Sequence, residues 1–311
     1  MSVTELGETH SYGPNAFGDD LRRFWNLTVT LAVTDYKLTY FGSVLGYVWS
    51  LMRPLLFFGV LYGVFTFIFQ VGKGVPNYSV ELLVAIILWT FFLQATAGCV
   101  QCMLAREGML RKMRFPRLVI PLAVTLTALF QLTTNLIPIF ALALGSGIMP
   151  RWSWLEIVPL VLLLAILALG IGMILSVLYV RFRDIQPIWD ITAQILFYAA
   201  PIIYPIFLYN HSVKTYRNAA GQLCPNYPNV PCTNNFTLHT VGRIAMANPI
   251  ATIIAQARHA LVGGLDSVNP SASFALGGPT MVLIPLGIIV AVFMLGLWVF
   301  NREAPRISEN L

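Results

Sequence analysis

The chain has 311 residues, of which 57% are hydrophobic and only 10% are charged, and its mean hydropathy is +0.74. A soluble domain carries about 25% charged residues. No protein core at this length could enclose so much apolar surface, so the composition excludes a soluble protein and predicts that lipid is the solvent. The net charge of +6 would suggest a nucleic-acid partner for a soluble protein. In a membrane protein, however, Lys and Arg gather in cytoplasmic loops, and we expect no nucleic acid here.

The amino-terminal segment, residues 1–46, is predicted to lie in the cytoplasm. Its first 20 residues are polar and lack the apolar stretch of a signal peptide. Residues 19–41 are mostly apolar but are interrupted by charges, each of which would cost about 2.5–3.5 kcal/mol at the centre of a bilayer. We therefore expect an interfacial amphipathic helix that lies on the membrane, with Trp25, Tyr36 and Tyr40 at headgroup depth.

Six apolar windows follow, and each is long enough to cross about 30 Å of hydrocarbon, which takes about 20 helical residues. They are residues 47–70, 81–104, 118–148, 155–180, 188–208 and 280–300. These windows define a six-span membrane domain, residues 47–300, with a long outer loop, 209–279, between the fifth and sixth spans. A short cytoplasmic tail, residues 301–311, follows the last span.

The distribution of Lys and Arg predicts the orientation of these spans. With the amino terminus inside, the four inner segments hold three, five, two and two cations, whereas the short outer loops hold only Lys73 and Arg151. Cations collect in cytoplasmic loops, and a long loop such as 209–279 counts little in this rule. Both termini and the stretch 106–117 are therefore predicted to be cytoplasmic.

The stretch 106–117, REGMLRKMRFPR, concentrates five cations around one acid. Residues 105–114 contain no Pro and could form a short helix, with Met and Leu side chains at spacings of 3 and 4 on one side. The helix would end before Pro116, because a residue that precedes Pro avoids the α region. The pattern alone leaves two interpretations open: a topology signal that attracts anionic lipid, or a helix that docks on a cytoplasmic partner.

The first span carries an aromatic face. Its rings are spaced by 11, 4, 3 and 4 residues from Tyr47 to Phe69, which places them on one side of a helix. Such a face could stack on sugar rings or accept lipid chains in weak, repeated contacts. Ordinary helix packing or lipid contact is the competing explanation. If the rings of this span line a path for a substrate, the path comprises Tyr47, Trp49, Phe58, Tyr62, Phe65 and Phe69, and Phe197 and Tyr198 of the fifth span could contribute further rings.

The outer loop contains signals for a second short helix. Pro201 and Pro205 would break the fifth span near its outer end. After the loop, Asn248-Pro249 predicts a helix start, and Gly263-Gly264 predicts its end. This helix is too short to span, so it either re-enters the membrane from outside or lies on the surface.

Two Cys residues, Cys224 and Cys232, bracket the sequence PNYPNVP in the outer loop. An oxidising exterior would permit a structural disulfide between them.

Several kinds of chemistry are missing from the chain. No G-x-x-x-x-G-K-[ST] phosphate loop is present, and the four His residues lack metal-ligand spacing, so we expect no ATP hydrolysis, metal or cofactor in this chain. The spans carry no acid in mid-membrane, which argues against an ion- or proton-coupled transporter. A membrane enzyme would need a reactive cluster. The outer loop offers only His211, His239, His259 and Asp266, without a recognisable nucleophile motif.

Five stretches then follow one another in a familiar order. They are DYKLTYFGSVLGYVWSLMRPLL at 35–56, LRKMRFPRLVIPL at 110–122, VRFRDI at 180–185, FYAAPIIYP at 197–205 and ANPIATIIAQARHAL at 247–261. Together they resemble the ABC-2 family of transporter permeases, in the branch that exports lipid-linked polysaccharides such as O-antigen, teichoic acid and galactan. The matching positions include Leu45, Gly46, Trp49, Pro54, Leu55, Leu56, Arg183, Asp184, Asn248, Pro249 and Arg258.

Two features depart from the family's pattern. Residues 38–42, LTYFG, are commonly more basic in the family, and the outer loop is long and holds the Cys pair. The first departure weakens any claim to lipid headgroup contacts at 38–42.

The resemblance implies an all-α integral protein of the bacterial plasma (inner) membrane. The implied fold has six transmembrane helices, an N-terminal interfacial amphipathic helix, a cytoplasmic coupling helix, and short re-entrant helices in the outer loop between spans five and six. Two copies of the chain would form the pore, and two separate ATP-binding-cassette subunits would bind ATP and Mg²⁺. The implied substrate is a lipid-linked glycan, moved from the cytoplasmic to the outer face among membrane lipids. An exporter of drugs or small lipids, and a membrane-bound glycan-modifying enzyme, are the alternatives.

The resemblance also assigns roles to residues. The implied ATPase-coupling helix comprises Arg106, Met109, Leu110, Arg111, Lys112, Met113, Arg114, Phe115 and Pro116. The implied outer gate comprises Pro201, Tyr204, Pro205, Asn248, Pro249 and Arg258.

Overall fold

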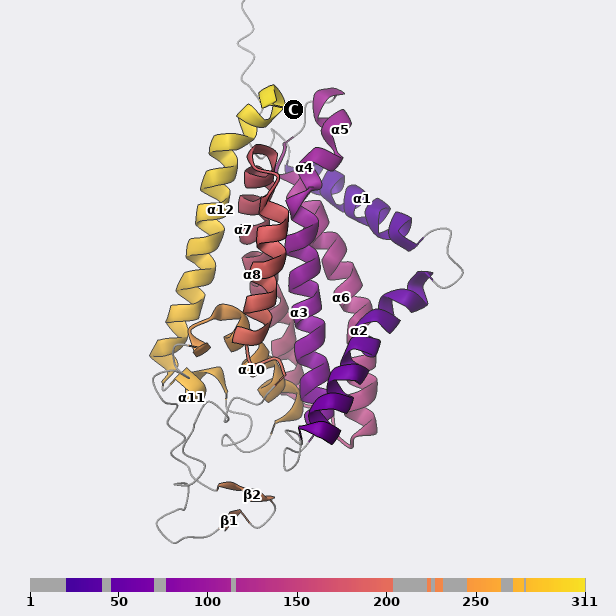
Figure 1. Ribbon diagram of the computed structural model, residues 1–311, viewed down its shortest axis with the longest axis vertical. Helices are drawn as coiled ribbons and strands as arrows, with labels where there is room; N and C mark the ends of the chain where they lie inside the picture. Colours follow the sequence, from indigo (N-terminus) through magenta and orange to yellow (C-terminus); the bar gives the residue numbers. More distant parts are fainter. Residues whose placement is uncertain are drawn as a thin grey trace, which may run out of the picture.

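A bundle of helices that lie side by side makes up most of the protein (Figure 1). This computed structural model describes residues 21–40, 46–69, 77–112, 116–203, 223–224, 227–231, 245–263, 271–276 and 278–310.

Within these residues, five helices are long and apolar enough to cross a membrane. They are α2 (Gly46–Gly63) with its π-helical continuation Val64–Ile68, α3 (Tyr78–Val100), α6 (Val119–Gly145), α7 (Ile157–Arg181) preceded by the 3₁₀ turn η2 (Trp152–Glu156), and α12 (Leu283–Asn310) preceded by the 3₁₀ turn η4 (Pro279–Val282). Each corresponds to one predicted window. The prediction of a helical membrane protein is therefore confirmed.

The predicted fifth span corresponds to α8 (Ile185–Ala199), which is shorter than expected. Its 15 residues extend about 22 Å, less than the roughly 30 Å of a hydrocarbon core. The helix ends where Ala200 becomes extended (φ −84°, ψ 145°), the conformation favoured before Pro201. Residues 204–208 of this window lie outside the described residues, so the six-span count stays a prediction.

Helix α3 occupies the centre of the bundle. It is apolar on all sides, as expected of a helix with neighbours all round, and 72% of its apolar window is buried within the chain. It packs against α2, α6, α7, α8 and α10 (Pro249–Val262). By contrast, only 6% of the apolar window of α2 is buried, so α2 presents most of its surface to whatever surrounds the chain.

Among the described residues, helices α7 and α12 make the most extensive helix–helix contact. A Cβ atom built on Gly296 would collide with the Gly170 carbonyl oxygen, and one built on Gly170 would lie 2.8 Å from the Phe293 Cα atom. Small residues at such crossings let membrane helices approach until their backbones touch. This pair of glycines therefore fixes where α7 and α12 cross.

The predicted amphipathic segment forms α1 (Leu21–Tyr40). Phe24, Thr28 and Ala32, four residues apart, are buried, and α1 packs along the first half of α6. The Thr127 hydroxyl of α6 donates to the Ala32 carbonyl at 3.2 Å. The helix and its two-faced character are confirmed, whereas its place at the membrane interface stays a prediction.

The outer loop contains an element that the sequence analysis did not foresee. Strands β1 (Leu223–Cys224) and β2 (Tyr227–Pro231) form a small antiparallel sheet at the end of the molecule opposite to α5 (Glu107–Lys112) and the carboxyl end of α12 (Figure 1). The all-α prediction is confirmed for the bundle, and this hairpin is an addition in the loop that the prediction did not include. Cys232, the predicted disulfide partner of Cys224, lies outside the described residues.

The contact between α7 and α12 leads to a stability prediction. Gly296→Ala should lower the free energy of unfolding by about 1–3 kcal/mol, because the added methyl group has no space against Gly170. Gly287→Ala on the same helix is the matched control, since no atom lies within 4 Å of the new Cβ. The control should be neutral or slightly stabilising. Thermal unfolding of the purified proteins tests this, and equal midpoints for the two variants would contradict it.

Candidate functional site

At one end of the bundle the chain leaves α3 through two short helices, α4 (Cys102–Ala105) and α5. Helix α5 lies beyond the ends of α3 and α6, beside the carboxyl end of α12 (Figure 1). It lies within the predicted helix 105–114, but the chain bends at Arg106, so the helical stretch is divided. Three predicted coupling residues, Met113, Arg114 and Phe115, lie outside the described residues.

Arg106, which the sequence assigned to the ATPase-coupling helix, points into the protein. Its guanidinium forms an ion pair with the Asp35 carboxylate of α1, and the Arg106 side chain is only 16% exposed. The residue lies between α4 and α5, so the ion pair ties the base of α5 to α1. This position suits a residue that orients α5 rather than one that contacts a partner.

Three other residues of the basic stretch are partly covered by the protein. Met109 and Pro116 are half-buried. Arg117 is also half-buried, and desolvation lowers the pKa of its guanidinium. The side chains of Leu110, Arg111 and Lys112 lie outside the described residues, so their predicted role stays a prediction.

The ion pair between Arg106 and Asp35 can be tested by exchanging its charges. Asp35→Arg and Arg106→Asp should each loosen α5 and speed tryptic cleavage after Arg111 or Lys112 several-fold. The double variant should restore part of the protection, because the opposite charges again face each other. We expect a coupling energy of about 1 kcal/mol, since the pair is partly exposed to water.

Lys37→Asp, an exposed change on the same helix, serves as the control and should leave the cleavage rate unchanged. The timing of each cleavage can be followed by mass spectrometry. Additive effects of the two single changes would show that the pair does not position α5.

At the opposite end, α10 is a 14-residue helix with 12 buried residues. The Asn248 side-chain oxygen accepts a hydrogen bond from the Ile250 amide at 3.0 Å, and Pro249 occupies the first helical position. At its other end Gly263 has φ +64°, a conformation that L residues rarely adopt. Both predicted ends of this helix are confirmed.

The last carbonyls of α10 are capped by η2. The Ser153 hydroxyl donates to the Ala260 carbonyl at 2.7 Å, and the Trp154 indole donates to the Leu261 carbonyl at 3.2 Å. Terminal carbonyls of a helix have no partners within the helix, and burial makes unpaired ones costly. Helix η2 therefore makes the burial of α10 possible.

Arg258 of α10 is the central polar residue of this end. It is 4% exposed, and its guanidinium donates to the Glu81 carbonyl at 3.2 Å and to the Ile202 carbonyl at 2.6 Å. The Tyr78 hydroxyl donates to the neighbouring Ile203 carbonyl at 2.6 Å. Arg258 and Tyr78 thus join the start of α3, α10 and the segment after α8 into one polar cluster, which we call the outer cluster.

The outer cluster contains part of the predicted gate and two residues that the sequence analysis missed. Pro201 immediately precedes Ile202, and Asn248-Pro249 begins the helix that carries Arg258, whereas Tyr204 and Pro205 lie outside the described residues. Tyr78 and Glu81 were not assigned to the gate. A signal was present in the sequence, because Glu81 is a carboxylate at the start of a predominantly apolar span. The structure shows that Glu81 is buried.

A substitution of Arg258 tests the outer cluster. Arg258→Met should lower the free energy of unfolding by about 3–5 kcal/mol, because two backbone carbonyls lose their donor and the buried Glu81 loses a nearby cation. Adding Glu81→Gln should recover part of this loss. Thermal unfolding in detergent measures both effects. If the free energy of unfolding falls in the double variant by the sum of the decreases in the two single variants, the two charges are not coupled.

The aromatic face of α2 is divided between the core and the surface. Phe58, Tyr62 and Phe65 pack against the core, and the ring of Tyr62 stacks on that of Tyr78 with centroids 6.3 Å apart. Phe197 of α8 is buried against Trp89, with centroids 5.6 Å apart.

The other described rings of the predicted path are exposed on the surface of the chain. Trp49, Phe69 and Tyr198 are 55%, 63% and 60% exposed, and the side chain of Tyr47 lies outside the described residues. Helix packing therefore accounts for the buried rings, while the exposed ones remain available to ligands or lipid.

Among the described residues, no three His, Cys, Asp or Glu side chains are grouped so that they could hold a metal ion. What this part of the chain does offer is a bundle of membrane-spanning helices, a short helix projecting at one end and a buried polar cluster at the other. These features define an integral membrane protein.

Residues 26–212, more than half of the chain, match the family described as "ABC-2 type transporter". The chain belongs to this family, whose members are membrane subunits of transporters rather than enzymes, and it is an integral protein of the plasma membrane.

The chain is also similar to proteins called "O-antigen export system permease protein RfbA". Two from Klebsiella pneumoniae are 30% and 32% identical to it over 186 and 188 residues, and one from Myxococcus xanthus is 28% identical over 187 residues. Each similarity covers 60% of this chain and 71% of the relative.

Proposed function

We propose that this chain is the transmembrane subunit of a bacterial ABC exporter that moves a lipid-linked polysaccharide from the cytoplasmic to the outer face of the plasma membrane. The observation that carries the proposal is the ABC-2 family match over 26–212, joined to similarity with permeases of O-antigen export. This reading is preferred to an exporter of drugs or small lipids, because the similar proteins are named for glycan export.

The energy for transport comes, in this proposal, from a separate ATP-binding-cassette subunit that binds ATP and Mg²⁺. The chain has no phosphate-binding loop of its own. Helix α5 is the docking element, since it lies beyond the end of α3 at this end of the bundle and the sequence around it carries Arg111, Lys112 and Arg114. Cations around Met and Leu anchors suit an interface with an apolar centre and a polar rim.

The proposed orientation places α5 and both chain termini in the cytoplasm. In Figure 1 α5 and the carboxyl end of α12 lie at one end of the bundle, and β1 and β2 lie at the other. The concentration of Lys and Arg in the segments at the α5 end supports this orientation. A sixth span would consist of α8 and the residues that follow it, and α10 would be the re-entrant helix.

Two copies of the chain would enclose the path of the glycan. Helix α2 supports this part of the proposal, because so little of its apolar window is covered within one chain. The exposed rings of Trp49 on α2 and of Phe69, just after its π-helical continuation, offer faces on which sugars or lipid chains can bind weakly and repeatedly. The outer cluster would close the path on the outer side.

Copurification tests the proposal. The chain is tagged, co-expressed with the ATP-binding-cassette subunit encoded beside it, and purified through its tag. The wild type should retain the ATPase and hydrolyse ATP, whereas Arg111→Glu/Arg114→Glu should retain little of it, because reversed charges repel an interface that is complementary to cations.

The matched control is Lys37→Glu/Arg302→Glu, which makes the same change in charge at exposed residues elsewhere on the chain. It should copurify normally. If both double variants retained the ATPase, the docking role of α5 would be wrong while the transporter class stood. If the wild type never bound an ATPase, the exporter would lack an energy source, and an enzyme acting on glycans would become the better explanation.

A further inference from the structure

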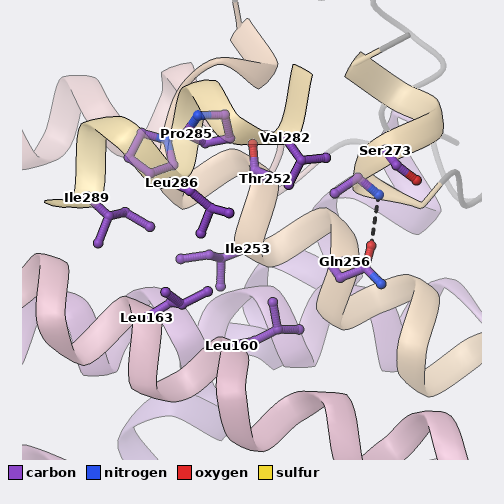
Figure 2. A pocket seen from close by; sticks show the side chains of 12 residues that line it. Leu160, Leu163, Thr252, Ile253, Gln256, Ser273, Val282, Pro285, Leu286 and Ile289 are labelled. Atoms are coloured by element: carbon purple, nitrogen blue, oxygen red, sulfur yellow. Dashed lines mark hydrogen bonds between the residues drawn. The ribbon is translucent and has the colours of Figure 1, made fainter. Parts of the chain in front are cut away.

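Helices α7 and α12 form a fork. They touch at Gly170 and Gly296, and toward the end that carries α10 a cavity lies between them. About 10 Å from the crossing, seven residues along each helix, Leu163 and Ile289 line a cavity of about 210 Å³ between the two arms. Figure 2 shows that α10 contributes Thr252, Ile253 and Gln256 to the same cavity.

The polar groups in the wall of this cavity are already bonded. The Gln256 amide donates to the Glu156 carboxylate at 2.7 Å and accepts from the Ala272 amide at 2.8 Å, the bond drawn in Figure 2. The second bond fastens α11 (Ala272–Leu276) beside the cavity. The Thr252 hydroxyl donates to the Met246 carbonyl, and the Ser273 hydroxyl lies 3.2 Å from that of Ser271.

The rest of the wall is hydrocarbon. It consists of Leu160, Leu163, Pro249, Ile253, Ala272, Val282, Pro285, Leu286 and Ile289. A water molecule needs two to four polar partners to be stable in a cavity, and these side chains offer none. The wall of the cavity therefore favours an apolar occupant over water.

The surroundings of the cavity identify the source of an apolar occupant. Both arms of the fork belong to helices that are long and apolar enough to span the bilayer. Beside the cavity, Leu162 on α7 and Leu283 and Ile284 on α12 are 54%, 67% and 47% exposed. Large aliphatic side chains so exposed on membrane-spanning helices face lipid chains rather than water.

We propose that this cavity binds one hydrocarbon chain of a membrane phospholipid, drawn from the leaflet at the α10 end of the bundle. A volume of about 210 Å³ is smaller than the roughly 300–1,000 Å³ of pockets that enclose a whole drug-sized ligand. The cavity can therefore hold only a portion of one hydrocarbon chain, and the lipid headgroup stays outside the cavity.

A hydrocarbon chain bound in the cavity would stabilise the outer cluster. Thr252, Ile253 and Gln256 form the cavity face of α10, and Arg258, on the same helix, binds the Glu81 and Ile202 carbonyls of the core. Filling the cavity replaces missing van der Waals contacts along α10 and so favours the arrangement in which Arg258 is buried. The lipid chain acts as a packing element for the outer cluster.

Photolabelling tests this site directly. The full-length protein is reconstituted in vesicles of phosphatidylcholine that carry a diazirine near the end of one acyl chain. It is then irradiated and mapped by peptide mass spectrometry. Adducts are expected on Ile253, which lines the cavity and is 3% exposed. Leu163→Trp should reduce these adducts several-fold by filling the cavity.

Leu162→Trp is the matched control, because it adds the same ring to the next residue, which faces lipid. It should leave labelling of α10 unchanged. Leu286→Trp fills the cavity from the other arm and replaces Leu163→Trp if that variant does not purify as a folded protein. Absence of α10 adducts in the wild type, or labelling that both filling variants leave intact, would overturn the proposal. Labelling of Ile253 by a diazirine-bearing polyprenyl phosphate but not by the phospholipid would also overturn it and assign the cavity to the lipid part of a substrate.

Discussion

Backbone groups in or beside hydrocarbon need partners within the protein, and this constraint shapes the α10 end of the molecule. Helix α8 stops at Ala199 and α10 is only 14 residues long, so several carbonyls are left without helical partners in a region shielded from water. Side chains from distant parts of the sequence supply the missing donors: Tyr78, Ser153, Trp154 and Arg258. Each donor lies on an element that is itself held in the bundle. Broken helices persist here because four separate segments meet at their ends.

A different constraint acts at the α5 end. A helix of six residues has too few internal hydrogen bonds to hold a fixed direction by itself. The ion pair between Arg106 and Asp35 supplies a tertiary contact at its base, and α1 is in turn fixed along α6 by buried side chains four residues apart. The amphipathic helix thus supports the projecting helix. This arrangement explains why a charge sits on α1 at a position that faces the protein rather than the lipid.

The sequence predicted features that depend on local chemistry and missed those that depend on distant partners. Apolar length located the five long helices, and Asn248-Pro249 and Gly263 marked the ends of α10, because caps and backbone conformation act within a few residues. The direction of Arg106 was missed because its partner lies 71 residues away. The partition of the α2 rings depends on what α3 and α8 present to them, which no periodicity encodes. The hairpin β1–β2 lies in the Pro-rich stretch that begins at Cys224, where the sequence predicted a disulfide but no strands.

The two ends of the molecule are joined by α3. Its first turn carries Tyr78 and Glu81 of the outer cluster, and after Val100 the chain continues directly into α4, Arg106 and α5. The helix contains no Pro and is packed against neighbours on all sides, so it resists bending. A partner that pushed on α5 would therefore either break the contact at Arg106 or shift α3 as a rod and alter the bonds of Arg258. Which of the two follows depends on whether the ion pair between Arg106 and Asp35 holds, since it ties this end of the chain to α1.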